Sequence, residues 1–116
     1  MTGLVRRFDF EAAHRLPHHP GKCRELHGHS YRLVVRVEGP VDAASGMVQD
    51  FADLKAAVRR EVLDQVDHRC LNELLDNPTA ELLAAWIWQR LAPAVAGLAE
   101  IELFETRDCS VVYRGG

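Results

Sequence analysis

The sequence is poor in the features that mark membrane, secreted and nucleic-acid-binding proteins. No apolar run approaches the length that crosses a bilayer, and the N-terminus lacks the apolar core of a signal peptide. The three cysteines form no Cys-x-x-Cys pair, and an odd number without a disulfide framework favours a reducing setting. A net charge of −3 gives no general attraction to nucleic acid. We therefore expect a cytoplasmic protein that binds neither membranes nor nucleic acids.

The length and composition fit one ordinary globular domain. A chain of 116 residues suffices for a single domain with a modest core but not for two. Hydrophobic residues make up 47% and charged residues 27%, which is the usual balance for a folded protein. The sequence shows no internal repeat, low-complexity tract or linker. We therefore expect a single domain that covers residues 1–116.

The spacing of apolar residues predicts an α+β fold. Alternation of apolar and polar residues predicts strands, whereas apolar residues at helical spacing predict helices. Asp50 and Thr79 are suited to cap the two helices, and Gly97 to end the second. The expected order is ββααββ: strands over about 3–13 and 28–39, helices over about 51–65 and from Thr79 to Gly97, and strands over 100–107 and 109–114. This order predicts a four-stranded antiparallel sheet with both helices on one face.

Three histidines on the first two expected strands are the strongest chemical signal. His27 and His29 are two residues apart, so their rings point to the same, apolar face of a strand, and His14 lies on the apolar face of the other strand. Three neutral imidazoles with one open position are typical of catalytic zinc. The alternative is three half-buried histidines that each form local hydrogen bonds. Their convergence from one hairpin favours metal binding, whereas His18 and His19 are expected to be exposed loop residues.

Cys23 precedes His27 by four residues, in the loop beside the expected metal site. A nearby cation lowers the pKa of a thiol, which makes Cys23 a candidate proton acceptor or nucleophile. The alternatives are a buried structural thiol and a fourth zinc ligand that would close the site. The flanking Lys22 and Arg24 favour an exposed, electropositive loop. With Arg15 they make this loop locally basic, which suits an anionic substrate group but also an ordinary solvated loop.

Two further groups carry possible chemistry. Asp67 and His68 follow the first expected helix, and a carboxylate beside an imidazole can fix its tautomer and raise its basicity. The same pair is also common at helix ends. Glu105 shares a strand face with Ile101 and Leu103, where a carboxylate needs a partner. That partner is either an arginine or the paired N–H groups of a guanidine-like heterocycle.

Taken together, these motifs resemble those of a known family. They are, in chain order, Phe10-Glu11-Ala12-Ala13-His14, Cys23-x-x-x-His27-Gly28-His29, Asp50-Phe51, Asp67-His68-x-x-Leu71-Asn72, Asn77-Pro78-Thr79-Ala80-Glu81 and Glu105-Thr106. The chain resembles the 6-pyruvoyl-tetrahydropterin synthase superfamily over nearly its whole length. The most similar branch is the bacterial 6-carboxy-5,6,7,8-tetrahydropterin synthases of queuosine and 7-deazapurine biosynthesis.

The resemblance implies more than spacing does. It implies the tunnelling fold, in which subunits join their sheets into barrels and two trimers stack as a homohexamer. It also implies zinc as the cofactor and roles for individual residues. These are zinc ligation by His14, His27 and His29, catalysis by Cys23 with Asp67 and His68, and binding of the pterin ring by Glu105.

The reaction implied by the resemblance is the conversion of a small-molecule substrate, 7,8-dihydroneopterin triphosphate. The products would be 6-carboxy-5,6,7,8-tetrahydropterin, acetaldehyde and triphosphate, so the protein would be a zinc-dependent carbon–carbon lyase. One alternative is a 6-pyruvoyl-tetrahydropterin synthase, which eliminates triphosphate and keeps the two carbons. Another is a zinc- or pterin-binding module without turnover, although the presence of Cys23 and His68 argues against it.

Overall fold

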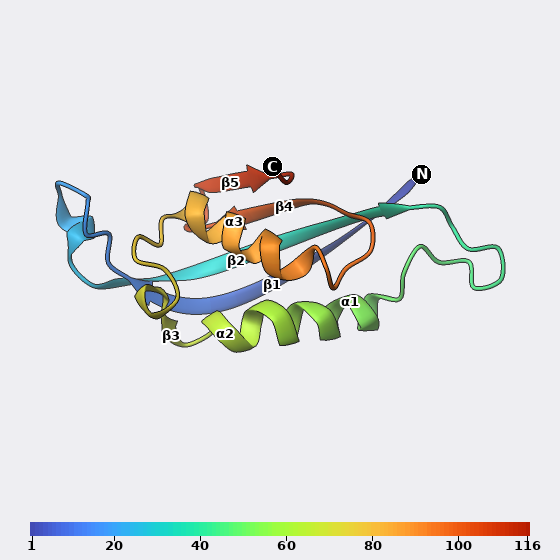
Figure 1. Ribbon diagram of the computed structural model, residues 1–116, viewed down its shortest axis with the longest axis horizontal. Helices are drawn as coiled ribbons and strands as arrows, with labels where there is room; N and C mark the ends of the chain where they lie inside the picture. The colour runs from blue at the N-terminus through green and yellow to red at the C-terminus, as the bar shows by residue number, and fades with distance from the viewer.

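The fold is built on an antiparallel hairpin of two long strands, β1 (Thr2–His14) and β2 (His27–Gly39). The computed structural model describes residues 1–116, and Figure 1 shows this hairpin running along the length of the molecule. The two strands pair continuously, from Thr2 opposite Gly39 to His14 opposite His27. The molecule is accordingly elongated, with extents of 54 × 24 × 22 Å.

The sheet has five strands rather than the four predicted. Its order is β3-β1-β2-β4-β5, with β4 at Leu98–Phe104 and β5 at Ser110–Tyr113. The additional strand, β3 (Arg69–Cys70), pairs in parallel with β1 at Ala12 and Ala13. Two residues are too few to produce an alternating pattern, so sequence spacing cannot reveal β3. The α+β class and the antiparallel pairing of the four longer strands are confirmed.

The first helix begins where the sequence predicted. Asp50 caps it by accepting a hydrogen bond from the backbone N–H of Ala52 at 2.7 Å. The helix runs through α1 (Phe51–Val58), a π-helical turn (Arg59–Leu63) and α2 (Asp64–Val66) without a break. This span agrees with the predicted helix over 51–65.

The second helix, α3 (Ala80–Leu91), has the predicted start but ends earlier than predicted. Thr79 caps it, its hydroxyl accepting a hydrogen bond from the N–H of Leu82 at 3.2 Å. The helix ends at Leu91 because Pro93 has no N–H to continue the hydrogen-bond ladder. Gly97 instead lies in the turn into β4 at φ 76°, where a Cβ atom would come within 2.4 Å of the Glu38 carbonyl oxygen.

Both helices cover the same face of the sheet. α3 packs against β4 and β5, and α2 packs against β1 (Figure 1). The strand residues that alternate toward them are buried, among them Phe8, Phe10, Tyr31 and Leu33. The same sides of β1 and β2 carry His14, His27 and His29, so these histidines lie on the face that the helices cover. None of the helices has the length and apolar character that a membrane crossing requires.

The short segments position the remaining candidate residues. Cys23 lies in a 3₁₀ turn (Lys22–Arg24), and a second 3₁₀ turn (Leu71–Glu73) follows β3. The last two strands are shorter than the predicted 100–107 and 109–114. β4 ends at Phe104 because the N–H groups of Glu105 and Thr106 both donate to the Cys109 carbonyl, at 3.0 and 3.5 Å. Glu105 therefore lies just beyond the strand on which the sequence placed it.

Candidate metal centre and its surroundings

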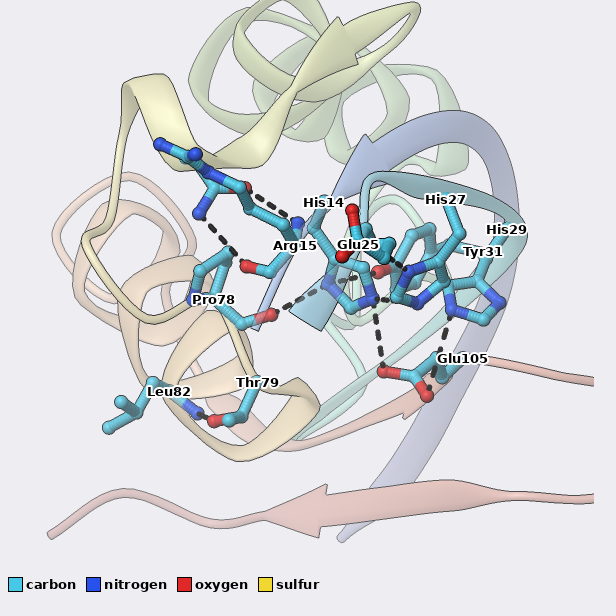
Figure 2. Close-up of polar contacts among 11 residues, drawn as sticks. His14, Arg15, Glu25, His27, His29, Tyr31, Pro78, Thr79, Leu82 and Glu105 are labelled. Atoms are coloured by element: carbon cyan, nitrogen blue, oxygen red, sulfur yellow. Dashed lines mark hydrogen bonds and ion pairs between the residues drawn. The ribbon is translucent and has the colours of Figure 1, made fainter. Parts of the chain in front are cut away.

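Three histidines converge at the end of the β1–β2 hairpin where the loop of residues 15–26 joins the two strands. His14 is the last residue of β1, His27 is the first of β2 and pairs directly with it, and His29 follows two residues later. One ring nitrogen of each lies within 4.8 Å of the other two (Figure 2). The sequence predicted this convergence, which follows from strand alternation together with the register of the hairpin. His18 and His19 are exposed, as predicted.

Backbone carbonyls determine which ring nitrogens face the centre. His14 Nδ1 lies 2.9 Å from the Pro78 carbonyl oxygen, and His27 Nδ1 lies 2.7 Å from that of Glu25. A carbonyl oxygen only accepts hydrogen bonds, so each Nδ1 donates a proton, and in the neutral form of the ring the lone pair is then on Nε2. These two Nε2 atoms are 3.1 Å apart. Two lone pairs at that distance repel one another, and a cation between them removes the repulsion.

His29 completes a donor set that fits a metal ion. Its Nε2 is buried and has no hydrogen-bond partner, which is costly for a polar atom unless a ligand satisfies it. Burial lowers the pKa of both His14 and His29, so both rings stay neutral, the form that coordinates metals. The three histidines can therefore hold a metal ion and leave a further coordination position unfilled by this cluster.

Glu105 lies beside this centre and has no arginine partner. Its two carboxylate oxygens are 4.0 Å from His14 Nε2 and 3.9 Å from His29 Nε2 (Figure 2). No arginine lies within ion-pair distance of it, so the predicted alternative of an arginine salt bridge is not found. Glu105 also lines a cavity of about 250 Å³ with the first turn of α3, including Thr79 and Ala80. The carboxylate thus faces both the metal centre and a space next to it.

Tyr31 is a component of the site that residue spacing did not single out. Its ring stacks on Phe10 with centroids 4.9 Å apart, and its hydroxyl oxygen lies 3.3 Å from His14 Nδ1. Burial, followed by the nearby charge of Glu105, raises the pKa of the Tyr31 hydroxyl well above its usual value. Tyr31 therefore stays neutral and packs against the ring of His14. Nothing in the residue spacing distinguishes it from the other apolar side chains of β2.

Asp67 and His68 form a pair anchored to β1. Asp67 accepts a hydrogen bond from the Glu11 N–H at 2.9 Å and lies 3.0 Å from His68 Nδ1. The Glu11 N–H is the main reason why the pKa of Asp67 is lowered. His68 adopts the left-handed φ of 59°, and its N–H donates to the Glu11 carbonyl. Together these contacts fix the orientation of the His68 imidazole.

His68 and His29 lie around the same cavity but do not contact each other through a hydrogen bond or an ion pair. Both residues line one cavity of about 500 Å³, but no hydrogen bond or ion pair links His68 to any of the three clustered histidines. The His68 side chain is 78% exposed. The His68 ring therefore contacts the Asp67 carboxylate and is otherwise open to this cavity.

Cys23 is half-buried and does not belong to the histidine cluster. Its thiol forms no hydrogen bond, whereas its carbonyl oxygen accepts one from the Leu16 N–H at 2.8 Å. Lys22 and Arg24 on either side are exposed, as the sequence predicted for this loop. The arrangement leaves the thiol available for chemistry and gives no support to Cys23 as a fourth ligand.

Comparison with known proteins agrees with this geometry. Residues 3–116 match the family described as 6-pyruvoyl tetrahydropterin synthase. The chain is 46% identical to a 6-carboxy-5,6,7,8-tetrahydropterin synthase from Synechocystis, covering 95% of this chain and 91% of that protein. It is 36% identical to the 6-pyruvoyl tetrahydrobiopterin synthase of Pongo abelii, covering 97% and 90%.

A solved structure extends the likeness to the fold. The 6-pyruvoyl tetrahydropterin synthase of Caenorhabditis elegans superposes with a TM-score of 0.91 at 32% identity, over 99% of this chain and 96% of that one. The tunnelling-fold subunit predicted from the sequence is therefore confirmed, with one strand more than expected. Sequence, site and fold together place this chain in the 6-pyruvoyl tetrahydropterin synthase family.

Proposed function

We propose that the protein converts 7,8-dihydroneopterin triphosphate and water to 6-carboxy-5,6,7,8-tetrahydropterin, acetaldehyde and triphosphate, in queuosine and 7-deazapurine biosynthesis. The observation that carries the proposal is the set of three histidines whose ring nitrogens converge beside the carboxylate of Glu105. The 46% identity to a protein named for this product supports it. The whole chain would act as one domain with zinc as its metal.

Zinc suits the donor set better than hard cations do. Neutral imidazole nitrogens are typical zinc ligands, whereas calcium and magnesium prefer oxygen. His14, His27 and His29 would hold the ion, and the carbonyls of Pro78 and Glu25 would fix two of the rings. When bound, zinc acts as a Lewis acid that lowers the pKa of the substrate's side-chain hydroxyls.

Glu105 would hold the pterin ring. Its carboxylate can accept two parallel hydrogen bonds from the amino-pyrimidine edge, which orient the ring as well as bind it. The cavity beside it is lined by Glu105 and the start of α3, and Glu105 itself lies beside His14 and His29. In this position the ring would place its side chain toward the metal centre.

Cys23, Asp67 and His68 would move protons. A Cys23 thiolate would take a proton from the substrate side chain, and His68 would serve as the complementary acid or base. Asp67 would keep the His68 ring oriented, since its Oδ1 is 3.0 Å from His68 Nδ1. The basic loop with Arg15, Lys22 and Arg24 would favour an anionic triphosphate nearby.

We further propose that the protein acts in the cytoplasm as a homohexamer made of two stacked trimers. The single chain leaves backbone groups unpaired along the outer edge of β5 and along β1 beyond its two-residue contact with β3. Open edges of this kind are usually paired or covered in native proteins. Pairing between subunits would provide hydrogen-bond partners for the backbone groups of both edges.

A second function is favoured by the names of other relatives. Similarity to two proteins named as 6-pyruvoyl synthases, from Pongo abelii and Caenorhabditis elegans, supports triphosphate elimination without loss of two carbons. The same zinc ligands and proton-transfer groups would serve either reaction. A zinc- or pterin-binding module without turnover is the third reading, which the presence of Cys23 and His68 disfavours.

The test is to incubate the zinc-loaded protein with 7,8-dihydroneopterin triphosphate and to analyse the products by mass. We expect 6-carboxytetrahydropterin with an equal amount of acetaldehyde. A 6-pyruvoyl product without acetaldehyde would support the second function, and unchanged substrate that remains bound would support the binding module. Protein with His27→Ala serves as the control for background decay of the substrate.

A further inference from the structure

The side chain of Asn72 binds both backbone groups of Arg15. Its Oδ1 accepts a hydrogen bond from the Arg15 N–H at 2.9 Å, and its Nδ2 donates to the Arg15 carbonyl at 2.9 Å. In Figure 2 two dashed lines end at the backbone of Arg15. The same Nδ2 also lies 3.5 Å from the Asp76 carbonyl, which holds the amide in place. Asn72 thus pairs with the residue that follows β1 as a neighbouring strand would.

These contacts come where the regular ladder has ended. The pairing of β3 with β1 stops at Ala13 opposite Cys70, and β1 itself ends at His14. Arg15 is the first residue after the strand and the start of the loop that returns to β2 at His27. The Asn72 amide therefore extends the ordered backbone by one residue beyond the metal-binding end of β1.

A backbone hydrogen bond connects this part of the loop to Cys23. Leu16, the residue after Arg15, donates its N–H to the Cys23 carbonyl at 2.8 Å. The thiol of Cys23 has no hydrogen bond of its own, so its place depends on the backbone of the loop. Asn72 fixes Arg15, Arg15 leads directly to Leu16, and Leu16 is bonded to the backbone of Cys23.

We propose that Asn72 is a positioning residue that holds the Cys23 loop against the metal centre. The inference rests on the proposed function for the role of Cys23, but not for the contacts themselves. A carboxamide is suited to this role because it offers a donor and an acceptor side by side. Aspartate at this position has nearly the same shape and keeps the acceptor for the Arg15 N–H. It replaces the donor with an oxygen, so the hydrogen bond to the Arg15 carbonyl is lost. Leucine loses both hydrogen bonds.

The metal ligands are held by other contacts. His14 is fixed by the Pro78 carbonyl and by its pairing with His27, which in turn bonds the Glu25 carbonyl. None of these involves Asn72. Loss of the Asn72 amide should therefore free the loop while leaving the histidine cluster and its bound metal intact.

The experiment compares Asn72→Leu and Asn72→Asp with Asp50→Ala in the zinc-loaded protein. Asp50→Ala removes a helix-capping hydrogen bond at the opposite end of the molecule and so controls for lost stability alone (Figure 1). The readouts are kcat, KM, zinc content and the alkylation rate of each cysteine by iodoacetamide, resolved by peptide mass. Cys109, which is exposed on the β4–β5 turn, provides an internal reference rate.

We expect both Asn72 variants to keep zinc, to lose about 10–100-fold in kcat with little change in KM, and to show faster alkylation of Cys23 relative to Cys109. Asp50→Ala should show neither change. Cys23 alkylation equal to that of the wild type would overturn the proposal, as would a kcat loss no larger than that of Asp50→Ala. Loss of zinc would also overturn it, because Asn72 would then support the ligand His14. A wild-type protein without turnover would count against the proposed function alone, and the alkylation rates would still decide the role of Asn72.

Discussion

The carboxylate of Glu105 lies 3.9 Å from Nε2 of His29, a buried nitrogen that has no hydrogen-bond partner. The spacing left two partners open for Glu105, an arginine or the N–H groups of a heterocycle, and no arginine lies within ion-pair distance of it. The carboxylate instead lies beside the ring nitrogens of the histidine cluster, and its side chain is 28% exposed. A substrate ring that binds Glu105 is thereby brought next to the metal site.

Replacing Glu105 by Gln tests this arrangement. The change keeps the shape but replaces one acceptor with a donor and removes the charge. We expect a loss of roughly 2–4 kcal/mol in transition-state binding, the order expected when a charge-assisted pair is broken in a desolvated pocket. Zinc content and melting temperature should stay close to those of the wild type. Glu102→Gln makes the same change on β4, where the carboxylate bonds Ser110, and should leave kcat/KM unaltered. Normal pterin binding by Glu105→Gln would end the anchor hypothesis.

The metal ligands can be tested separately from catalysis. Purified protein should contain about one zinc per chain, as a three-histidine site implies. His27→Ala should lose most of it, because the remaining two rings offer only two nitrogen donors. His19→Ala is the matched control, since His19 is exposed and bonds only its own loop through the Gly21 N–H. Metal analysis that finds full zinc in His27→Ala would contradict the ligand assignment.

Much of this site was predictable because strand geometry is periodic. Alternation along β1 and β2 places His14, His27 and His29 on one face, and a hairpin brings two strands together in a single register. The helix caps at Asp50 and Thr79 were predictable for a similar reason, since capping depends on residues only two or three positions apart.

The contacts that hold the site in place were not predictable from spacing. The Pro78 carbonyl that fixes His14 and the Asn72 amide that binds Arg15 come from segments far along the chain. β3 is only two residues long and pairs in parallel, so it leaves no pattern in the sequence. α3 ends early because Pro93 interrupts the ladder, an effect that the apolar spacing alone conceals.

Cys23→Ala distinguishes a catalytic thiol from a zinc ligand. Cys23 is not part of the histidine cluster, so the variant should retain its zinc. Turnover should fall by about 100-fold or more, because proton transfer by a positioned group contributes rate factors of that order. Cys109→Ala provides the control, since Cys109 is exposed and lies outside the histidine cluster. Retained activity in Cys23→Ala would exclude the catalytic role, and lost zinc would instead support the fourth-ligand alternative.

The stability of the metal-free protein should depend on pH through the buried histidines. Burial lowers the pKa of His14 and His29 below the usual value of 6.5 in the folded chain, whereas in the unfolded chain both return to it. As the pH falls below that value, the unfolded state therefore binds protons before the folded state does. Titration of these two histidines therefore leaves the free energy of unfolding unchanged above pH 6.5. Below that value it reduces the free energy of unfolding progressively, as the pH falls toward the lowered folded-state pKa.

Melting temperatures of chelator-treated protein between about pH 8 and pH 5 measure this effect, because the window spans the ordinary histidine pKa. We expect a decline on the acidic side that becomes shallower in His14→Leu, which keeps the site apolar but removes one titrating group. His19→Ala should retain the full decline, because its side chain is exposed. Zinc should shift the decline to lower pH, since protons must then displace the metal before the rings can charge. An equal slope in wild type and His14→Leu would show that buried histidine titration does not govern the acid stability of this fold.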